Sequence, residues 1–365
     1  KIREFLEREN QDIEVIVRCS GGSQANIEDL LLGRSQMAIV QSDTLHNEMN
    51  TGQIRNKINK SRAEDDQADV EIQPIASLFP EYTQILVAKE SDVENVIQLV
   101  DKRVFIGKEG SGAEANTEKV FEIVRIIDEE GNNYDRILEL PDDDGQPQPL
   151  GNTKAMQAVH AGEIDAAVRV TGNVFPKLSE WKDKLKLVSL DEDLQAEILD
   201  EYSYYGMTGF VIGGERFNTL YTRAVLLVSD DIGDWVSDDL IYELAGYVSE
   251  ELPADFQKGL DKGNAAIFPA DKIASGLPMT FHPAAKRYFQ DHDLMVDNTS
   301  RLWRFILLIW VILFVIKLSM DSRTPLEQRL YTHTGPWAEK ILEFTVGQAL
   351  WLLAMLEDAL NSVWR

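Results

Sequence analysis

The chain has 365 residues, of which 44% are hydrophobic, and a formal net charge of −26 from 62 acidic and 36 basic side chains. This length predicts about two domains with a sizeable core, which excludes disorder over most of the chain. The strong acidity argues against nucleic acid or an anionic membrane surface as a partner of the main domain.

The first elements alternate between helices and strands. Residues 1–10 (KIREFLEREN) suit a helix, and because the chain opens inside it we interpret the amino terminus as truncated. Residues 13–18 (IEVIVR) alternate as a strand does, so Cys19 beside them is expected to be a small buried apolar side chain. A helix that stops at Gly33 and a buried strand at 37–43 (MAIVQSD) follow.

The middle of the chain continues this alternation. A charged surface segment is predicted at 56–71, strands at 72–79, 83–89 and 103–107, a helix at 113–130, a loop at 141–151, and a helix with its strand at 153–172. Further strands are predicted at 186–190, 206–214 and 224–229, before an amphipathic helix at 238–252.

One unit occurs twice in this order. Residues 26–43 and 155–172 each read as a helix, a glycine and an apolar strand that ends in polar residues. Alternating strands and helices predict an α/β fold with a mostly parallel sheet, whose ligands bind at the carboxyl ends of strands. The candidate strand ends are Gln41-Ser42-Asp43, Gly107 to Glu114 and Arg169 to Asn173.

A glycine-rich stretch, GKEGSGAEAN (107–116), follows one strand and opens a helix. Glycines let a ligand approach the backbone, and the first amides of a helix lie at the positive end of its dipole, so together they form an anion site. The alternative is an ordinary glycine turn with Ser111 as the helix cap. The spacing matches neither GxGxxG nor GxxxxGK[ST], so dinucleotide and nucleoside triphosphate binding lose support.

A second loop of this kind is SGGSQAN (20–26), in which Ser23 could cap its helix or donate to a ligand. Two helix amino termini that face one cleft would hold a small carboxylate. Arg169 lies at the end of an otherwise apolar strand, where it is either a bidentate clamp on that carboxylate or part of a structural salt bridge.

Motifs for catalysis, metals and cofactors are missing from the sequence. The five histidines form no metal-spaced pair, and no GxSxG motif supplies a nucleophile. We therefore expect no catalytic residue, no metal and no cofactor, and we interpret the acidic run at 142–144 as a solvated loop.

The composition changes sharply near the carboxyl terminus. Residues 302–320 (LWRFILLIWVILFVIKLSM) predict a transmembrane helix of roughly 28 Å against a hydrocarbon core of about 30 Å, the alternative being a buried core helix. The flanking charges favour a single-pass topology with the main domain outside the cell membrane. The tail, 321–365, contains an amphipathic or nearly apolar helix that could lie at the interface, pair with the span or meet a protein.

Four stretches together resemble one family. They are GGSQANIEDLL with AIVQSD, then GKEGSGAEAN, then AVHAGEIDAAVRVTG, and finally GLPMTFHPAAKRYF. Over residues 5–292 the chain resembles the TAXI family, the extracytoplasmic solute receptors of TRAP transporters. The family usually has threonine where this chain has Ala113, and begins with a strand and a glycine loop that this sequence does not contain.

The resemblance implies a two-lobed, type II-like periplasmic-binding-protein fold over residues 1–295 that closes on a ligand without catalysis. It implies a small carboxylate ligand, such as glutamate or 2-oxoglutarate, and a TRAP permease as the membrane partner. The implied ligand-binding residues are Ser23, Asn26, Gln41, Ser42, Asp43, Gly110, Ser111, Gly112, Glu114, Thr171 and Gly172, to which the residue pattern adds Arg169.

The resulting hypothesis is a receptor, held to the membrane by residues 302–320, that passes its solute to the permease. A membrane-anchored sensor that signals through the span is the alternative. An enzyme on the same fold is a third possibility, for which the sequence offers no acid, base or nucleophile.

Overall fold

The structure is a computed structural model in which the chain divides into two units, Lys1–Met295 and Val296–Arg365. It describes residues 1–295, except 62–69, 125, 129–130, 143, 173–180, 182, 191–193, 195, 197, 200–201, 203, 213–214, 231–235, 254–267, 269, 275–276 and 278. The predicted span at 302–320 and the tail at 321–365 lie outside the described residues. None of the described helices has the length and apolarity needed to cross a membrane.

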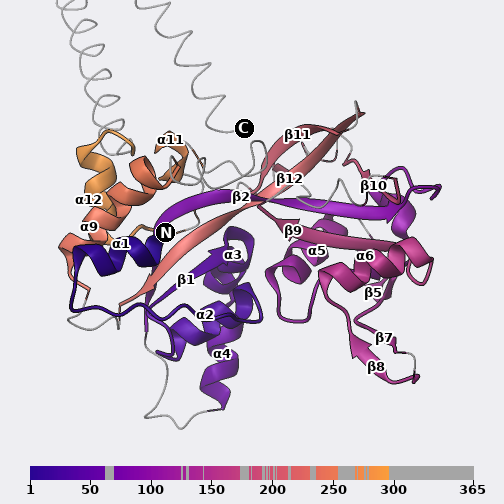
Figure 1. Cartoon of the computed structure of the whole chain (residues 1–365), viewed down its shortest axis with the longest axis horizontal. Helices are drawn as coiled ribbons and strands as arrows, with labels where there is room; N and C mark the ends of the chain where they lie inside the picture. Colours follow the sequence, from indigo (N-terminus) through magenta and orange to yellow (C-terminus); the bar gives the residue numbers. More distant parts are fainter. Residues whose placement is uncertain are drawn as a thin grey trace, which may run out of the picture. The chain divides into compact units, whose positions relative to one another are not determined.

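Helices and strands alternate along the described chain (Figure 1). The helices are α1 (Ile2–Glu9), α2 (Ser23–Leu31), α3 (Ser42–Thr51), α4 (Gln53–Lys60), α5 (Gly112–Ile123), α6 (Asn152–Ala161), α9 (Asp238–Gly246), α11 (Ala270–Ile273) and α12 (Pro283–Asp291), with a 3₁₀ turn at Val96–Leu99 and a π-helical turn at Tyr247–Glu251. The strands are β1 (Met37–Gln41), β2 (Ile72–Ala88), β3 (Arg103–Phe105), β4 (Ile127–Asp128), β5 (Gly131–Asn132), β6 (Asp135–Arg136), β7 (Glu139–Pro141), β8 (Pro147–Pro149), β9 (Ala166–Thr171), β10 (Leu185–Val188), β11 (Gly206–Ile212) and β12 (Glu215–Ser229).

Two long strands, β2 and β12, form the centre of the main sheet, whose order is β1-β12-β2-β9-β3-β6. Strand β10 also pairs with β2, and β11 with β12. The pairings of β2 with β12, β9 and β10, and of β12 with β1 and β11, are antiparallel, and only the described pairings of β3 are parallel. The predicted mostly parallel sheet was therefore wrong, although the predicted α/β fold class was right.

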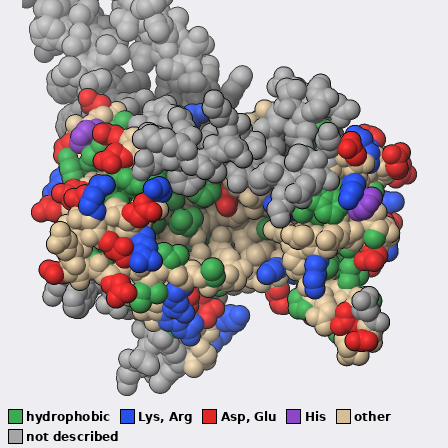
Figure 2. Space-filling model, in the orientation of Figure 1, with side chains coloured by type: hydrophobic (Ala, Val, Ile, Leu, Met, Phe, Trp, Pro, Cys, Tyr) green, Lys and Arg blue, Asp and Glu red, His purple; other side chains and the backbone are tan. Residues whose placement is uncertain are grey.

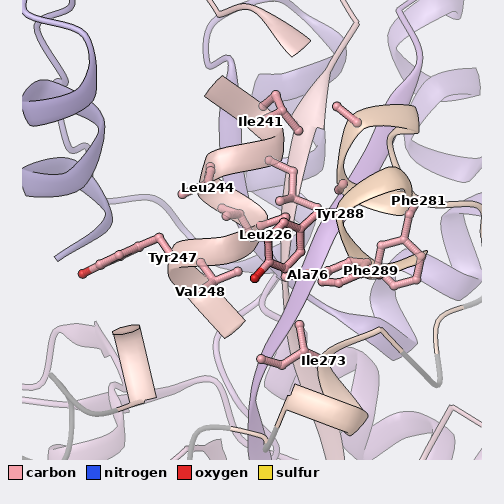
Figure 3. Close-up of a cluster of buried hydrophobic side chains, with 14 of the residues drawn as sticks. Ala76, Leu226, Ile241, Leu244, Tyr247, Val248, Ile273, Phe281, Tyr288 and Phe289 are labelled. Carbon is pink, nitrogen blue, oxygen red and sulfur yellow. The ribbon is translucent and has the colours of Figure 1, made fainter. Parts of the chain in front are cut away.

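Two lobes share this sheet, because β2 and β12 run side by side through both (Figure 1). The first lobe contains α1 to α4, β1, α9, α11 and α12, and the second contains β3 to β11 with α5 and α6. Each lobe has its own apolar clusters. In the first lobe, Phe289 of α12 and Leu244 of α9 are fully buried and pack against Leu226 of β12 (Figure 3).

The repeated helix–glycine–strand unit is confirmed in both lobes. In the second lobe, Gly162 ends α6 in the left-handed conformation, with φ of 76°, and β9 follows. Gly33, with φ of 66°, stands in the same place between α2 and β1. Glycine suits these positions because it has no Cβ to clash in that conformation.

Several local expectations need correction. Residues 13–18 are not a strand, since their backbone pairs with no described strand, and Cys19 beside them is exposed rather than buried. The two strands predicted at 72–79 and 83–89 are one strand, β2. The loop predicted at 141–151 contains β8, which pairs with β7 as a small hairpin.

Candidate functional site

A cleft of about 660 Å³ opens between the two lobes. In Figure 2 the surface between the lobes is hollowed and mostly tan, so backbone and uncharged polar side chains form much of it. The first lobe and β2 contribute Gly21, Gly22, Ser23, Asn26, Ile39, Val40, Gln41 and Glu81 to the cleft wall. The second lobe contributes Gly107, Lys108, Ser111, Gly112, Ala113, Pro149, Leu150, Gly151, Asn152, Thr153, Lys154 and Val170.

The amino termini of three helices, α2, α5 and α6, line this cleft. No side chain of the described residues caps α2 or α6, whose N-cap residues are Gly22 and Gly151. At α5 the hydroxyl of Ser111 accepts a hydrogen bond from the amide of Glu114, at 3.2 Å. The first amides of a helix have no partner within the helix, so three sets of donors and three positive dipole ends point toward one space.

Another helix of this chain shows how a carboxylate uses such a terminus. Glu48, which is buried, accepts hydrogen bonds from the amides of Ile54 and Arg55 at the start of α4, at 2.7 and 3.0 Å. The chain's own carboxylate therefore satisfies α4, whereas α2 and α6 present uncapped termini to the cleft. An anion in the cleft would complete these helices as Glu48 completes α4.

The two glycine loops touch each other across the cleft. A Cβ at Gly22 would lie 3.0 Å from the Cα of Ser111, and a Cβ at Gly112 would lie 2.6 Å from the Oγ of Ser23 and still closer to the Gln41 amide. Glycine is required here because a side chain would hold the two helix termini apart. The absence of a Cβ at these positions thus brings α2 and α5 together.

A hydrogen-bonded chain forms part of the cleft wall. The amide of Gln41 donates to the Oγ of Ser23 at 3.1 Å, and its side-chain Nε2 donates to the carboxylate of Glu81 at 2.7 Å. The pKa of Glu81 is raised to about 7, mainly by burial; the Gln41 hydrogen bond opposes this rise and the nearby charge of Asp43 adds to it. Glu81 is therefore an acidic group in a site whose other features attract anions.

Two lysines supply positive charge to the same cleft. Lys108 lies in the glycine loop before α5, and Lys154 lies in the first turn of α6. In a chain with a net charge of −26, they provide the local attraction that an anionic ligand needs. Among the described residues, no group of three His, Cys, Asp or Glu side chains could hold a metal ion.

Five of the predicted site residues lie at the cleft: Ser23, Asn26, Gln41, Ser111 and Gly112. Asn26 also fastens α2 to the sheet, because its Nδ2 donates to the carbonyl of Ile39 at 2.8 Å. The structure thus brings the two glycine loops to one place, as the sequence predicted.

Two other predicted residues, Ser42 and Asp43, lie behind the cleft wall rather than in it. They begin α3 instead of ending a strand, and both are buried. Asp43 accepts hydrogen bonds from Asn116 of α5 at 2.7 Å and from the hydroxyl of Tyr205 at 3.2 Å. Burial raises the pKa of Asp43, while these hydrogen bonds lower it. The hydrogen bond between Asp43 and Asn116 joins α3 of the first lobe to α5 of the second, which is a structural role.

Gly110 and Glu114 also make contacts with other residues of the protein rather than with the cleft. The Glu114 carboxylate accepts from the amide of Gly110 at 2.6 Å and pairs with Arg136. Neither residue lines the cleft. Together they shape the loop from which Ser111 and Gly112 reach the cleft.

The three predicted residues at the end of β9 lie outside the cleft wall as well. Val170 lines the cleft, so Arg169, its neighbour on the strand, points to the opposite face, where its Nη1 lies 3.9 Å from the Sδ of Met156. Thr171 pairs with Tyr82 of β2, and Gly172 lies against the ring of Phe79. Burial lowers the pKa of Arg169.

Sequence reasoning missed Glu81 and the start of α6 from Gly151 to Lys154. A signal existed for both. Glu81 is a charged residue inside an apolar run, FPEYTQILVA (79–88), and GNTK (151–154) places a glycine directly before a helix. Lys108 lies inside the glycine stretch itself and was not named.

The sequence profile of the NMT1-like family matches residues 2–292, most of the 365-residue chain. The chain belongs to the NMT1-like family. The chain is also similar to several solved structures, at sequence identities of 11–16% and TM-scores of 0.36–0.43.

Three of these solved structures are binding proteins. The periplasmic aliphatic sulphonate binding protein from Escherichia coli is 12% identical, with a TM-score of 0.43, over 70% of this chain and 69% of that one. The alkanesulfonate-binding protein from Xanthomonas axonopodis pv. citri, bound to MOPS, is 16% identical, with a TM-score of 0.40, over 79% and 76%. An amino acid ABC transporter substrate-binding protein from Streptococcus pneumoniae, bound to L-arginine, is 13% identical, with a TM-score of 0.37, over 72% and 84%.

Proposed function

We propose that this NMT1-like protein is a non-catalytic extracytoplasmic receptor that binds a small carboxylate in the cleft between its lobes. The observation that carries the proposal is the convergence of three helix amino termini, two of them without a side-chain cap, on one cleft. Helix amino termini bind anions through free amides and the positive end of the dipole. Lys108 and Lys154 add positive charge at the same cleft.

The two-lobed arrangement supports a receptor that closes on its ligand. The cleft wall draws on both lobes, so a ligand that contacts α2 and α6 together stabilises the closed form. Strands β2 and β12 connect the lobes, and the network around Asp43 lies at their junction. The closed receptor presents a different surface to its membrane partner than the open receptor does. The partner can therefore distinguish the ligand-bound form and take the ligand from it.

The resemblance to TAXI receptors supports a TRAP-type permease as the acceptor of the solute. On this proposal, residues 302–320 anchor the receptor beside the permease. Anchoring would replace a search in three dimensions by a high effective concentration near the membrane partner.

Calorimetric titration of the full chain tests the carboxylate proposal. The probes are acetate, succinate and 2-oxoglutarate, each compared with its uncharged amide, and glutamate, compared with its diamide, which keeps the ammonium group. We expect at least one acid to bind, and its amide to bind at least tenfold more weakly, because the helix termini select the negative charge. Equal affinity for an acid and its amide, or no binding by any probe, would overturn the proposal.

A further inference from the structure

Glu81 is unusual among the groups that line the cleft, because it is the one carboxylate among the described lining residues. Its carboxylate accepts a hydrogen bond from the Nε2 of Gln41, at 2.7 Å. No lysine, arginine or histidine of the described residues lies within ion-pair distance of it. Lys108 and Lys154 line the same cleft without pairing with Glu81, so its ionised carboxylate is free to pair with a positive group of a ligand.

Gln41 holds this carboxylate in place at the cleft. The residue is 5% exposed and lines the cleft, and its Oε1 is fully buried against Gly112 with no hydrogen-bond partner among the described residues. Because a carboxylate only accepts, the hydrogen bond to Glu81 fixes Nε2 as the donor and leaves Oε1 as the acceptor. The Glu81 carboxylate, held by Gln41 at the cleft, is therefore the acceptor that an ammonium group of a ligand would meet.

We propose that Glu81, with Gln41, is the specificity-determining group of the cleft and selects ligands that carry an ammonium group beside their carboxylate. The inference rests on the proposed function, since the helix termini are taken to hold the carboxylate. On this proposal, Glu81 determines whether the cleft prefers an amino acid or the oxo acid with the same carbon skeleton.

The separation of the two charge-binding regions fits such a ligand. The Gln41 amide lies against Gly112 at the start of α5, and its other end reaches Glu81. One glutamine side chain therefore spans the distance from anion-binding amides to the carboxylate. An α-amino acid carries its two charges across a comparably short distance, on adjacent carbon atoms.

The surroundings of Glu81 predict how pH changes the selection. On the neighbouring strand it pairs with Thr222, which is uncharged, while Asp43 raises its pKa and Lys108 and Lys154 line the same cleft. With a pKa of about 7, the carboxyl is largely protonated at pH 6 and ionised at pH 8. Preference for the amino member should therefore rise between pH 6 and pH 8, because only the ionised form attracts an ammonium group.

The test measures affinities of the full chain for matched pairs that differ only in the amino or oxo group. The pairs are alanine and pyruvate, glutamate and 2-oxoglutarate, and leucine and 4-methyl-2-oxopentanoate. The variant is Glu81→Gln, which keeps the shape and removes the charge. The control is Glu122→Gln on α5, an exposed carboxylate that pairs with Lys119 and does not line the cleft.

We expect the wild-type chain to prefer the amino member of at least one pair at pH 8. Glu81→Gln should reduce that preference at least tenfold and remove its pH dependence, while the oxo acid still binds, which shows that the variant is folded. Glu122→Gln should leave both affinities unchanged. If the oxo acids bind as well as the amino acids, or if Glu81→Gln keeps the preference, the assignment of Glu81 is wrong and the carboxylate receptor stands. If neither member of any pair binds, the proposed function fails and this inference fails with it.

Discussion

Gly112 shows how much the cleft depends on the absence of a single methyl group. A Cβ at this position would lie 2.6 Å from the Oγ of Ser23 and in collision with the Gln41 amide. Because Gln41 is the flexible partner, it would move, and its hydrogen bond to Glu81 would break. The residue therefore controls both the approach of the two loops and the orientation of Gln41.

Gly112→Ala should weaken binding of the preferred carboxylate by roughly tenfold, or about 1.4 kcal/mol, because the helix termini are held apart. Gly21→Ala is the matched control, since Gly21 also lines the cleft and its added Cβ would make an ordinary contact of 3.5 Å with Ala25. Calorimetric titration of both variants compares them. An equal loss in the two variants would contradict the role of Gly112.

Glu81 should also affect stability, with a sign set by its raised pKa. The folded protein holds this proton up to a pH of about 7, against an ordinary value of 4.5, so the unfolded state releases it first. The free energy of unfolding therefore falls as pH rises from about 4.5 to 7, by roughly 3 kcal/mol at most. Glu81→Gln, which has no charge to bury, should be more stable than the wild type at pH 8 and no more stable at pH 4.5.

Urea unfolding of both proteins at pH 4.5, 6 and 8 measures this difference. Titration of all other groups is common to the two proteins and cancels in the comparison. A stability difference that is the same at pH 4.5 and pH 8 would show that Glu81 is not a buried carboxyl with a raised pKa.

The sequence predicted some site residues and not others for a physical reason. Glycines and a serine before a helix encode their backbone role locally, so the loops around Ser23 and Ser111 could be predicted. The direction of Arg169 depends on the register of β9 against β2, which no local pattern contains. Glu81 was missed because a single acid in an apolar strand says nothing of which groups lie opposite it.

Among the elements, α5 combines a helix cap with a cleft position. Its N-cap, Ser111, accepts from an amide at 3.2 Å, and so does Ser237, the N-cap of α9, which does not line the cleft. Ser111→Ala and Ser237→Ala should each lower the free energy of unfolding by about 1 kcal/mol. Only Ser111→Ala should weaken carboxylate binding, because the first turn of α5 lines the cleft and that of α9 does not.

Chemical unfolding and calorimetric titration of the two variants separate the effects. Were Ser237→Ala to weaken binding as much as Ser111→Ala, the loss would follow from general destabilisation, and the α5 terminus would have no specific part in it.

Element type was easier to predict than element pairing. The helices and most strands follow from apolar periodicity and from glycine stops such as Gly162. The relative direction of the strands does not follow from these local patterns. It depends on β12 (215–229), which is distant in sequence from β1 and β2 and pairs antiparallel with both. Apolar and polar residues alternate over residues 13–18 as in a strand, yet these residues form no strand, because the pattern alone does not provide a neighbouring strand to pair with.

At the scale of the whole molecule, the net charge of −26 opposes an anionic ligand at long range. Salt screens this field, while Lys108 and Lys154 act at short range within the cleft. The association rate of an anionic ligand such as glutamate should therefore rise by roughly a fewfold between 10 and 150 mM salt. Alanine, a zwitterion without net charge, is the control and should show little change.

Stopped-flow measurement of both association rates tests this expectation. A rate for glutamate that falls with added salt would mean that local attraction by the lysines dominates even at long range.

The shared strand β12 has a consequence for the synthesis of the protein. Among the described strands, β1 pairs with β12 alone, so the sheet of the first lobe lacks a central strand until residue 229 has been made. At roughly 5 to 20 residues per second, the ribosome needs about 10 to 40 s to travel from β1 to the end of β12. During that interval the edge of β1 and the apolar face of α2 have no permanent cover. We therefore expect the nascent first lobe to expose apolar surface that chaperones bind, although the finished protein buries the same surface.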